Sequence, residues 1–421
     1  MPVDLPIASF TDASPVPPRL VVWLGLLMLV MLAGAGGTLF TWPQGEPTGS
    51  PWFWTKLLVL PALGFCVAFG LRLFYYEQES ERVRAEVATL KDDQAKALLF
   101  ASAPLAVLDC RYLCALENRQ AANQKAPAHS ILSARVPHSG GSAVRHTALK
   151  FGEPQSLPER YRACFLELLD EIGPAIASLP LDVPFNVCLA LPVNPENLEQ
   201  DDLSAIWQSC WRESGLRPAK ASRLFAEQGL MPLDGWLDVR GDVALEKVTL
   251  YVCAQLHATP PHNSAEAAVA LLLGWPPLLE RRGLKPLAML HRPVDAGTGA
   301  LDDALLKALL WGRSTAPEIG DLWQAGLASD DKPAILQSAS ALSLGVSKSW
   351  NLSGVHDIDT TLGHAGVAAG WLATAFAVEH VAQAHTPQLI AYRAGSLQLA
   401  VVNPVARHAC DPTERAPAPC L

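Results

Sequence analysis

The chain has 421 residues, of which 50% are hydrophobic and only 17% charged, and its formal net charge is −9. This length allows two or three domains, and the apolar composition indicates that part of the chain lies in lipid. The negative charge and the lack of a long basic cluster argue against nucleic acid as a partner.

Two apolar segments near the N-terminus predict a transmembrane hairpin over 19–76, preceded by a cytoplasmic tail over 1–18. Residues 20–40 carry no charge and, as a helix rising ~1.5 Å per residue, are long enough to cross a bilayer. The second segment covers 52–74, and Pro61 within it predicts a kink. A cleaved signal peptide is the alternative for the first segment, but its apolar core exceeds the usual ~7–15 residues and a second span follows closely.

The basic residues predict the orientation of this hairpin. Arg19 precedes the first span, Arg72 and Arg82 end or follow the second, and the connection over 41–51 has no Lys or Arg. We therefore expect a two-pass protein of a bacterial inner membrane with both termini and the soluble domain in the cytoplasm. The nine cysteines are scattered and odd in number, so they give no disulfide framework, which agrees with a reducing compartment.

Beyond the hairpin the sequence predicts a layered α/β domain. Residues 77–100 form a charged, helix-favouring stalk, 117–146 is a polar loop, and 405–421 is a flexible tail. Strands and helices alternate between them, which argues for an α/β layered fold. We expect a first α/β half over 101–260 and a second over 261–404. The expected strands are 104–109, 183–191, 247–256, 287–290, 388–392 and 397–402, and the expected helices are 159–172, 201–215, 264–273, 302–311 and a helix after Gly366.

The most informative motif is the small-residue segment that runs from Gly363 and His364 through Gly366 to Gly370 and enters an apolar helix. Glycines at a loop-to-helix junction let the backbone approach a neighbour closely, and free N–H groups there can meet an anion. Two readings stay open: tight packing of a small-residue helix, or a ligand site.

This motif, together with the Ser264–Gly274 segment that contains Glu266, resembles the C-terminal half of thiolase-like condensing enzymes. The resemblance implies a thiolase-like fold. These enzymes use a cysteine at a helix start, a histidine in a His-Gly-Thr-Gly-Thr loop and a lysine shortly before the Gly-His pair. Here Asp359 stands where that lysine is expected, and 335–344 contains no such histidine loop.

The cysteines of the domain do not restore this set. Cys188 and Cys253 lie in apolar, strand-like segments, where a thiol is a small hydrophobe and not an activated nucleophile. We therefore expect no catalytic residue, no cofactor and no metal, with His364 as a structural relic.

A second resemblance covers the whole chain. The two spans, the aromatic exit at 74–77, the stalk, the segment around Glu266, and Asp359 with Gly363 and His364 together look like the type VI lipase adapter family of proteobacterial type VI secretion clusters. This resemblance implies a non-catalytic adapter at the inner-membrane lipid that binds a phospholipase effector and aids its loading on the spike protein. The candidate contact surfaces are 117–146 and 212–236.

Two alternatives to the adapter remain. One is a degenerate thiolase-like enzyme that acts on acyl-thioesters, with Cys253 or His364 in an altered role. The other is a structural subunit of a membrane complex. The oligomeric state, the effector and any residual acyl-thioester binding are left open by the sequence.

Overall fold

The computed structural model describes residues 17–43, 45–116, 131–137, 140–152, 156–193, 200–239, 242–297 and 299–405. The chain divides into two compact units, a helical unit that ends at Leu99 and an α/β unit that begins at Phe100. The predicted C-terminal tail beyond Val405, most of the N-terminal tail, and the polar loop over 117–130 lie outside the described residues.

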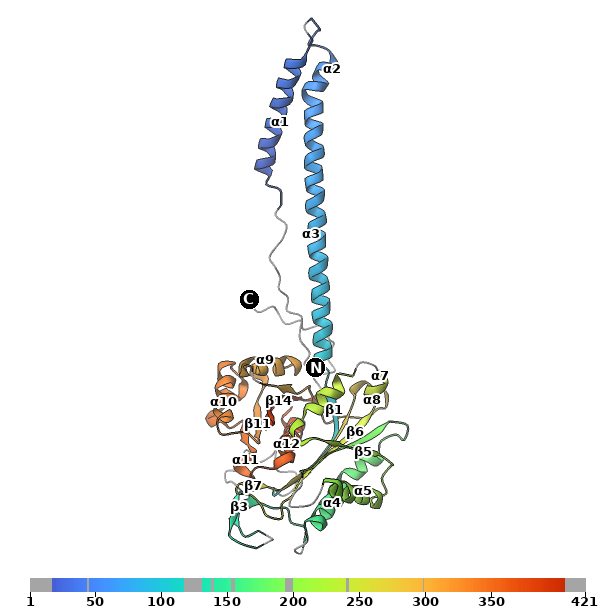
Figure 1. The fold of residues 1–421 in the computed structure, drawn as a ribbon, viewed down its shortest axis with the longest axis vertical. Helices are drawn as coiled ribbons and strands as arrows, with labels where there is room; N and C mark the ends of the chain where they lie inside the picture. Colours follow the sequence, from blue (N-terminus) through green and yellow to red (C-terminus); the bar gives the residue numbers. More distant parts are fainter. Residues whose placement is uncertain are drawn as a thin grey trace. The chain divides into compact units, whose positions relative to one another are not determined.

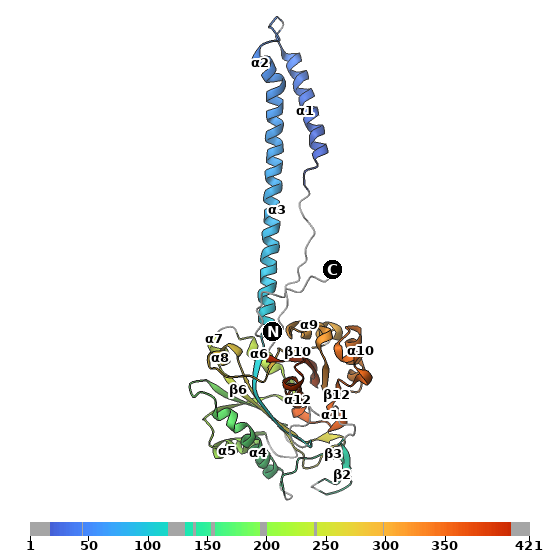
Figure 2. The ribbon, with the colours of Figure 1, turned by 180° about the vertical axis from the view of Figure 1, so that it is seen from behind.

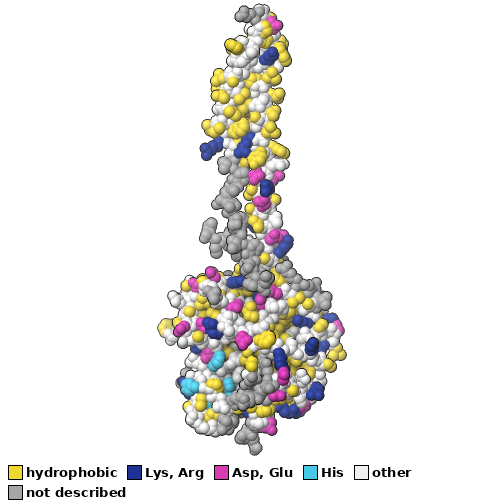
Figure 3. All heavy atoms as spheres, viewed as in Figure 1, with side chains coloured by type: hydrophobic (Ala, Val, Ile, Leu, Met, Phe, Trp, Pro, Cys, Tyr) yellow, Lys and Arg dark blue, Asp and Glu magenta, His cyan; other side chains and the backbone are white. Residues whose placement is uncertain are grey.

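The helical unit contains two helices that are long and apolar enough to cross a membrane. The first is α1 (Leu20–Thr41); the second is continuous over α2 (Pro51–Trp54), a π-helical turn η1 (Thr55–Val59) and α3 (Leu60–Ala101). Each contains a segment of mean hydropathy 2.2 with no residue buried. Hydrophobic side chains cover this part of the unit, and charged side chains become frequent farther along α3 (Figure 3).

The π-helical turn lies just before Pro61, where the sequence predicted a kink. Proline has no N–H to donate to the preceding turn, and a π-helical turn is one way in which a helix absorbs that loss. Small residues pack α1 against this irregular segment: a Cβ placed on Gly34 would lie 2.3 Å from Pro61 Cγ. On the same pair of helices, the Trp23 ring makes edge contacts with Phe65 and Phe69.

The α/β unit consists of two repeats with the same topology. The strands of the first repeat are β1 (Leu105–Leu113), β4 (Phe185–Ala190), β5 (Lys220–Leu224), β6 (Val248–Gln255) and β8 (Ala267–Gly274). Those of the second are β9 (Ala288–Leu290), β11 (Asp321–Ala325), β12 (Val355–Asp357), β13 (Gln388–Ala394) and β14 (Ser396–Asn403). The sheet order is β5-β4-β6-β8-β1 followed by β9-β14-β13-β11-β12, so the second repeat mirrors the first across the β1–β9 contact.

The strand directions repeat as well. In the first repeat β4 is parallel to β5 and β6, and β8 is antiparallel to β6 and β1. In the second repeat β11 is parallel to β12 and β13, and β14 is antiparallel to β13 and β9. Two short strands lie beside these, β10 (Val294–Asp295) on β14 and β7 (Ser264–Ala265) in a small sheet with β2 (Ser133–Arg135) and β3 (Val144–Thr147).

The helices form three layers around the two repeats (Figures 1 and 2). The central helix α12 (Ala369–Ala384) belongs to a core that contains apolar residues of both repeats. α4 (Leu157–Ala177) and α5 (Gln200–Glu213) cover the outer face of the first repeat in a second core. α9 (Leu301–Trp311), with α10 (Asp331–Ala341) beside it, packs on β14 of the second repeat.

Most of the predicted elements are confirmed, and the α/β class is correct. The clearest error is the helix expected over 264–273, which is β7 followed by β8. All eight residues of β8 are buried, because it is a central strand with both faces covered, and the segment therefore lacks the alternation that marks a half-exposed strand. Because β8 pairs within the first repeat, the topological division falls after Gly274, later than the predicted division at residue 260.

Candidate functional site

The loop that carries Gly363 and His364 is held against β7 by its backbone. The His364 N–H donates to the Asn263 carbonyl at 2.7 Å, and the Ala265 N–H donates to the His364 carbonyl at 2.9 Å. Gly363 has φ +107°, and a Cβ there would lie 2.5 Å from the Ser264 carbonyl oxygen. Only glycine permits this approach, so the loop extends the small β2–β3–β7 sheet by one bridge.

The two following glycines of the motif also make close contacts. Gly366 has φ +53°, and a Cβ on it would lie 2.4 Å from Gln255 Oε1, which also accepts a 3.4 Å hydrogen bond from the Val367 N–H. Gly370, in the first turn of α12, lies against the buried ring of Tyr392, which a Cβ would approach to 2.4 Å. Of the two readings of the motif, the geometry of its glycines favours packing.

The His364 side chain remains accessible. Its side chain is 58% exposed, and its Nδ1 lies 3.8 Å from Asp359 Oδ1, an oxygen that has no hydrogen-bond partner among the described residues. The Asp359 carboxylate raises the pKa of His364 above its ordinary value, although partial burial acts in the opposite direction. Gly326, in the loop after β11, lies next to the ring: a Cβ there would be 3.3 Å from His364 Cε1.

Glu266 has a different role from that of the histidine loop, although it lies only two residues from Ser264. Its side chain is 2% exposed and forms a buried ion pair with Arg160 of α4 at 2.5 Å. The carboxylate also accepts from the backbone N–H groups of Leu149 at 2.8 Å and His257 at 2.9 Å. Glu266 therefore joins α4 and two loops to the start of β8, which is a structural role.

A comparison of the two repeats shows what is missing around His364. In the second repeat, the connection from β12 to β13 holds the His364 loop and the long buried helix α12. In the first repeat, the described part of the connection from β5 to β6 holds only the seven-residue α6 (Met231–Leu237), the four-residue α7 (Asp242–Leu245) and a 3₁₀ turn. The sequence of that connection, 225–247, contains no cysteine, and the 326–330 segment beside His364 contains no second histidine.

The cysteines that the sequence singled out are placed in the sheet. Cys253 of β6 is 1% exposed in the central core, and burial raises the pKa of its thiol well above the ordinary value. Cys188 of β4 is partly exposed, and burial raises its thiol pKa as well. A neutral thiol is a poor nucleophile, so neither residue has the environment of an activated cysteine.

A polar cluster that the sequence did not indicate lies at the start of β11. His356 Nε2 lies 2.9 Å and His380 Nε2 3.2 Å from the two carboxylate oxygens of Asp321, and the Trp323 ring stacks on His356 with centroids 4.1 Å apart. Burial alone would raise the pKa of Asp321, but the two imidazoles lower it well below its ordinary range. The cluster fastens α12 to β11 and β12.

The repeated topology and the layers around α12 define a thiolase-like, condensing-enzyme fold. Solved structures confirm this fold assignment. The ketosynthase from module 6 of the bacillaene synthase of Bacillus subtilis 168 is 12% identical with a TM-score of 0.53, over 72% of this chain and 70% of that chain. The module 1 ketosynthase of the bacillaene synthase of Bacillus amyloliquefaciens FZB42 is 12% identical with a TM-score of 0.50, over 72% and 76%.

Similarity at this identity shows the fold alone. No family model matches the sequence, and a search of the curated proteins gives no match either. The resemblance to the type VI lipase adapter family therefore stays a prediction.

Proposed function

We propose that this protein is a membrane-anchored, non-catalytic binding protein whose thiolase-like domain serves as a scaffold for a partner. The observation that carries the proposal is the incomplete site around His364. The loop and helix that present the histidine are intact, but the described part of the β5–β6 connection in the first repeat holds only short helices, and the sequence of that connection contains no cysteine. A scaffold that keeps its core and loses its nucleophile can still present surfaces.

The resemblance to the type VI lipase adapter family identifies the partner in this proposal as a phospholipase effector, which the protein holds for transfer to the secretion spike. The apolar helices support an inner-membrane anchor, with both termini and the domain in the cytoplasm as the placement of the arginines implies. A reporter fused after Leu421 tests this topology. Activity in the cytoplasm is expected, and activity confined to the periplasm would contradict it.

The surface proposed for the partner lies within 212–236. It contains β5, which ends the sheet and pairs only with β4 among the described strands. An edge strand presents unpaired backbone groups that a partner strand can extend. Directly after it, the Phe225 side chain is 71% exposed, and a large exposed aromatic next to a free edge is typical of a contact surface.

The experiment is a pull-down of a type VI phospholipase effector by the full-length chain in neutral detergent micelles. Capture is expected for the parent, and Phe225→Ala should weaken it by at least about tenfold, the effect of removing one aromatic anchor. Trp350→Ala is the matched control, because Trp350 is 84% exposed in the second repeat, away from β5. Equal capture by the Phe225 variant would exclude this surface, and no capture by the parent would count against the adapter function.

The second candidate is a degenerate enzyme that acts on an acyl-thioester. It rests on one observation, the accessible His364 side chain beside Asp359. Such an enzyme needs His364 for turnover, so His364→Ala should abolish thioester hydrolysis if this candidate is correct. The adapter proposal predicts no hydrolysis by either protein.

A further inference from the structure

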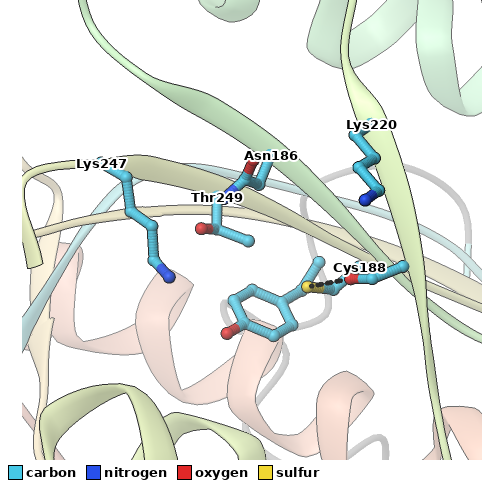
Figure 4. A pocket seen from close by; sticks show the side chains of 7 residues that line it. Asn186, Cys188, Lys220, Lys247 and Thr249 are labelled. Atoms are coloured by element: carbon cyan, nitrogen blue, oxygen red, sulfur yellow. Dashed lines mark hydrogen bonds between the residues drawn. The ribbon is translucent and has the colours of Figure 1, made fainter. Parts of the chain in front are cut away.

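A polar pocket with a volume of ≈ 280 Å³ lies on the sheet of the first repeat (Figure 4). Its lining residues are Asn186, Cys188, Lys220, Ser222, Lys247, Thr249 and Tyr251. All come from β4, β5 and β6 or the residue before β6, so the floor of the pocket is the sheet itself.

The strand register explains why these side chains meet. Asn186 pairs with Lys220 on one side and with Thr249 on the other, and Cys188 pairs in the same way with Ser222 and Tyr251. Residues two apart in a strand share a face, so the side chains form two cross-strand rows on one face. The alternate residues of β4 and β6 point the other way, into the core that contains α4 and α5.

The second repeat shows what normally covers such rows. There Asp321 of β11 pairs with Gln388 of β13, as Asn186 of β4 pairs with Thr249 of β6, and the next row contains His356 and Trp323. Helix α12 lies over these rows and supplies His380, whose ring nitrogen reaches the Asp321 carboxylate. The Asp321 carboxylate of the second repeat thus has its partners within the protein itself.

In the first repeat the corresponding connection has only short helices in its described part, and the polar groups lack such partners. Neither Lys220 nor Lys247 has a carboxylate partner among the described residues, and Lys247 Nζ instead lies 5.1 Å from the centroid of the Trp236 ring. Thr249 is 3% exposed, and its hydroxyl has no hydrogen-bond partner among the described groups. A buried hydroxyl without a partner is unfavourable, so this one indicates a ligand.

The charge of the lining defines the ligand class. Two of the seven lining residues are lysines and none is acidic, and Figure 4 shows the lysines on opposite sides of the pocket. The Cys188 thiol contacts the Ser222 hydroxyl at 3.3 Å, and burial keeps that thiol neutral by raising its pKa. The pocket therefore offers two positive charges and several hydrogen-bond donors without a competing anion.

We propose that this pocket binds an oxyanion, the phosphate or carboxylate group of a small ligand, between Lys220 and Lys247 with the Thr249 hydroxyl as an additional donor. Ammonium and hydroxyl groups make short, charge-assisted hydrogen bonds to such oxygens. This inference does not depend on the proposed partner.

The test is isothermal titration of the full-length protein in neutral detergent micelles with inorganic phosphate and, separately, with acetate, using sodium chloride of equal ionic strength as the blank. Saturable binding of at least one of the two oxyanions is expected, and the one that binds names the class. Lys247→Gln and Thr249→Val should each weaken it by at least about tenfold, because each removes a donor from a shielded site. Lys285→Gln, which removes an exposed lysine outside the pocket, should leave it unchanged.

Lys220→Gln is the pocket variant in which a loss of oxyanion binding cannot be attributed to misfolding, because Lys220 is exposed on the edge strand and its replacement leaves the core intact. A second readout is specific to the pocket: the bound oxyanion should slow alkylation of Cys188, measured by peptide mass spectrometry, and should not do so in the Lys247→Gln variant. Absence of saturable binding by both anions, or equal binding by the parent and the pocket variants, would overturn the proposal. Capture of the protein partner is measured in a separate experiment, with Phe225→Ala. A failure of the partner proposal and a failure of the oxyanion proposal can therefore be told apart.

Discussion

Replacement of Glu266 by alanine measures how much the buried ion pair with Arg160 stabilises the α/β unit. The variant leaves the Arg160 guanidinium, whose side chain is 7% exposed, without its counter-charge, and leaves the N–H groups of Leu149 and His257 without their acceptor. Removal of one partner from a buried pair costs about 3–5 kcal/mol, a figure that includes the polar groups left without their partner. We expect the free energy of unfolding to fall by about 3–5 kcal/mol.

Urea unfolding of the full-length protein in neutral micelles, followed by tryptophan fluorescence, gives this change. Trp207 is a suitable reporter because it packs on Phe165 of α4, with ring centroids 5.2 Å apart. Glu213→Ala is the matched control. Glu213 of α5 pairs with Arg162, which lies on α4 as Arg160 does, but both side chains are at least 44% exposed, so a change of about 0–1 kcal/mol is expected. If Glu266→Ala shifts the unfolding midpoint no more than Glu213→Ala does, the structural role of Glu266 is refuted.

Two further predictions concern the second repeat. Gly370→Ala should destabilise the domain by about 1–3 kcal/mol, because the added methyl overlaps the ring of Tyr392. Gly235→Ala in α6 is the control: no atom lies within 4 Å of the added Cβ, so this variant should be neutral or stabilising by up to about 1 kcal/mol. Thermal melts of both variants check the contrast, and equal melting temperatures would contradict the packing role of Gly370. The pKa of Asp321 is lower in the folded protein than in the unfolded chain, so its contribution to stability is present above about pH 4 and is lost as the pH falls toward its folded value. Asp321→Asn should therefore reduce the loss of stability on acidification from about pH 5 to 3, and an unchanged acid-unfolding curve would show that its two imidazole contacts contribute nothing.

The fold class could be predicted from the sequence because strands and helices alternate and because short motifs resemble a known fold. The boundaries of α4 illustrate how local signals suffice: Ser156 and Glu159 form a capping box at its start, and the apolar residues that follow face one core. β8 shows where such signals fail. An alanine- and leucine-rich segment favours a helix by propensity, and only its position between β1 and β6 makes it a strand.

The internal repeat and the pocket could not be predicted, because both depend on long-range pairing. Lys220 and Lys247 are 27 positions apart, and nothing local to either lysine relates it to Asn186 of β4. The shortened connection between β5 and β6 is visible in the sequence only once the longer connection of the second repeat is known to be its counterpart. By contrast, the Gly363-His364 motif predicted a close backbone approach at a loop-to-helix junction, which the contact with Ser264 explains.

The claim that the thiolase-like domain binds and does not catalyse is tested most directly by a search for a covalent intermediate. The full-length protein and His364→Ala are incubated with acetyl-coenzyme A, as a representative acyl-thioester, and examined by intact and peptide mass spectrometry. Our account predicts no acyl adduct on any cysteine and no difference between the two proteins. A cysteine-linked acyl group whose formation or turnover requires His364 would contradict it.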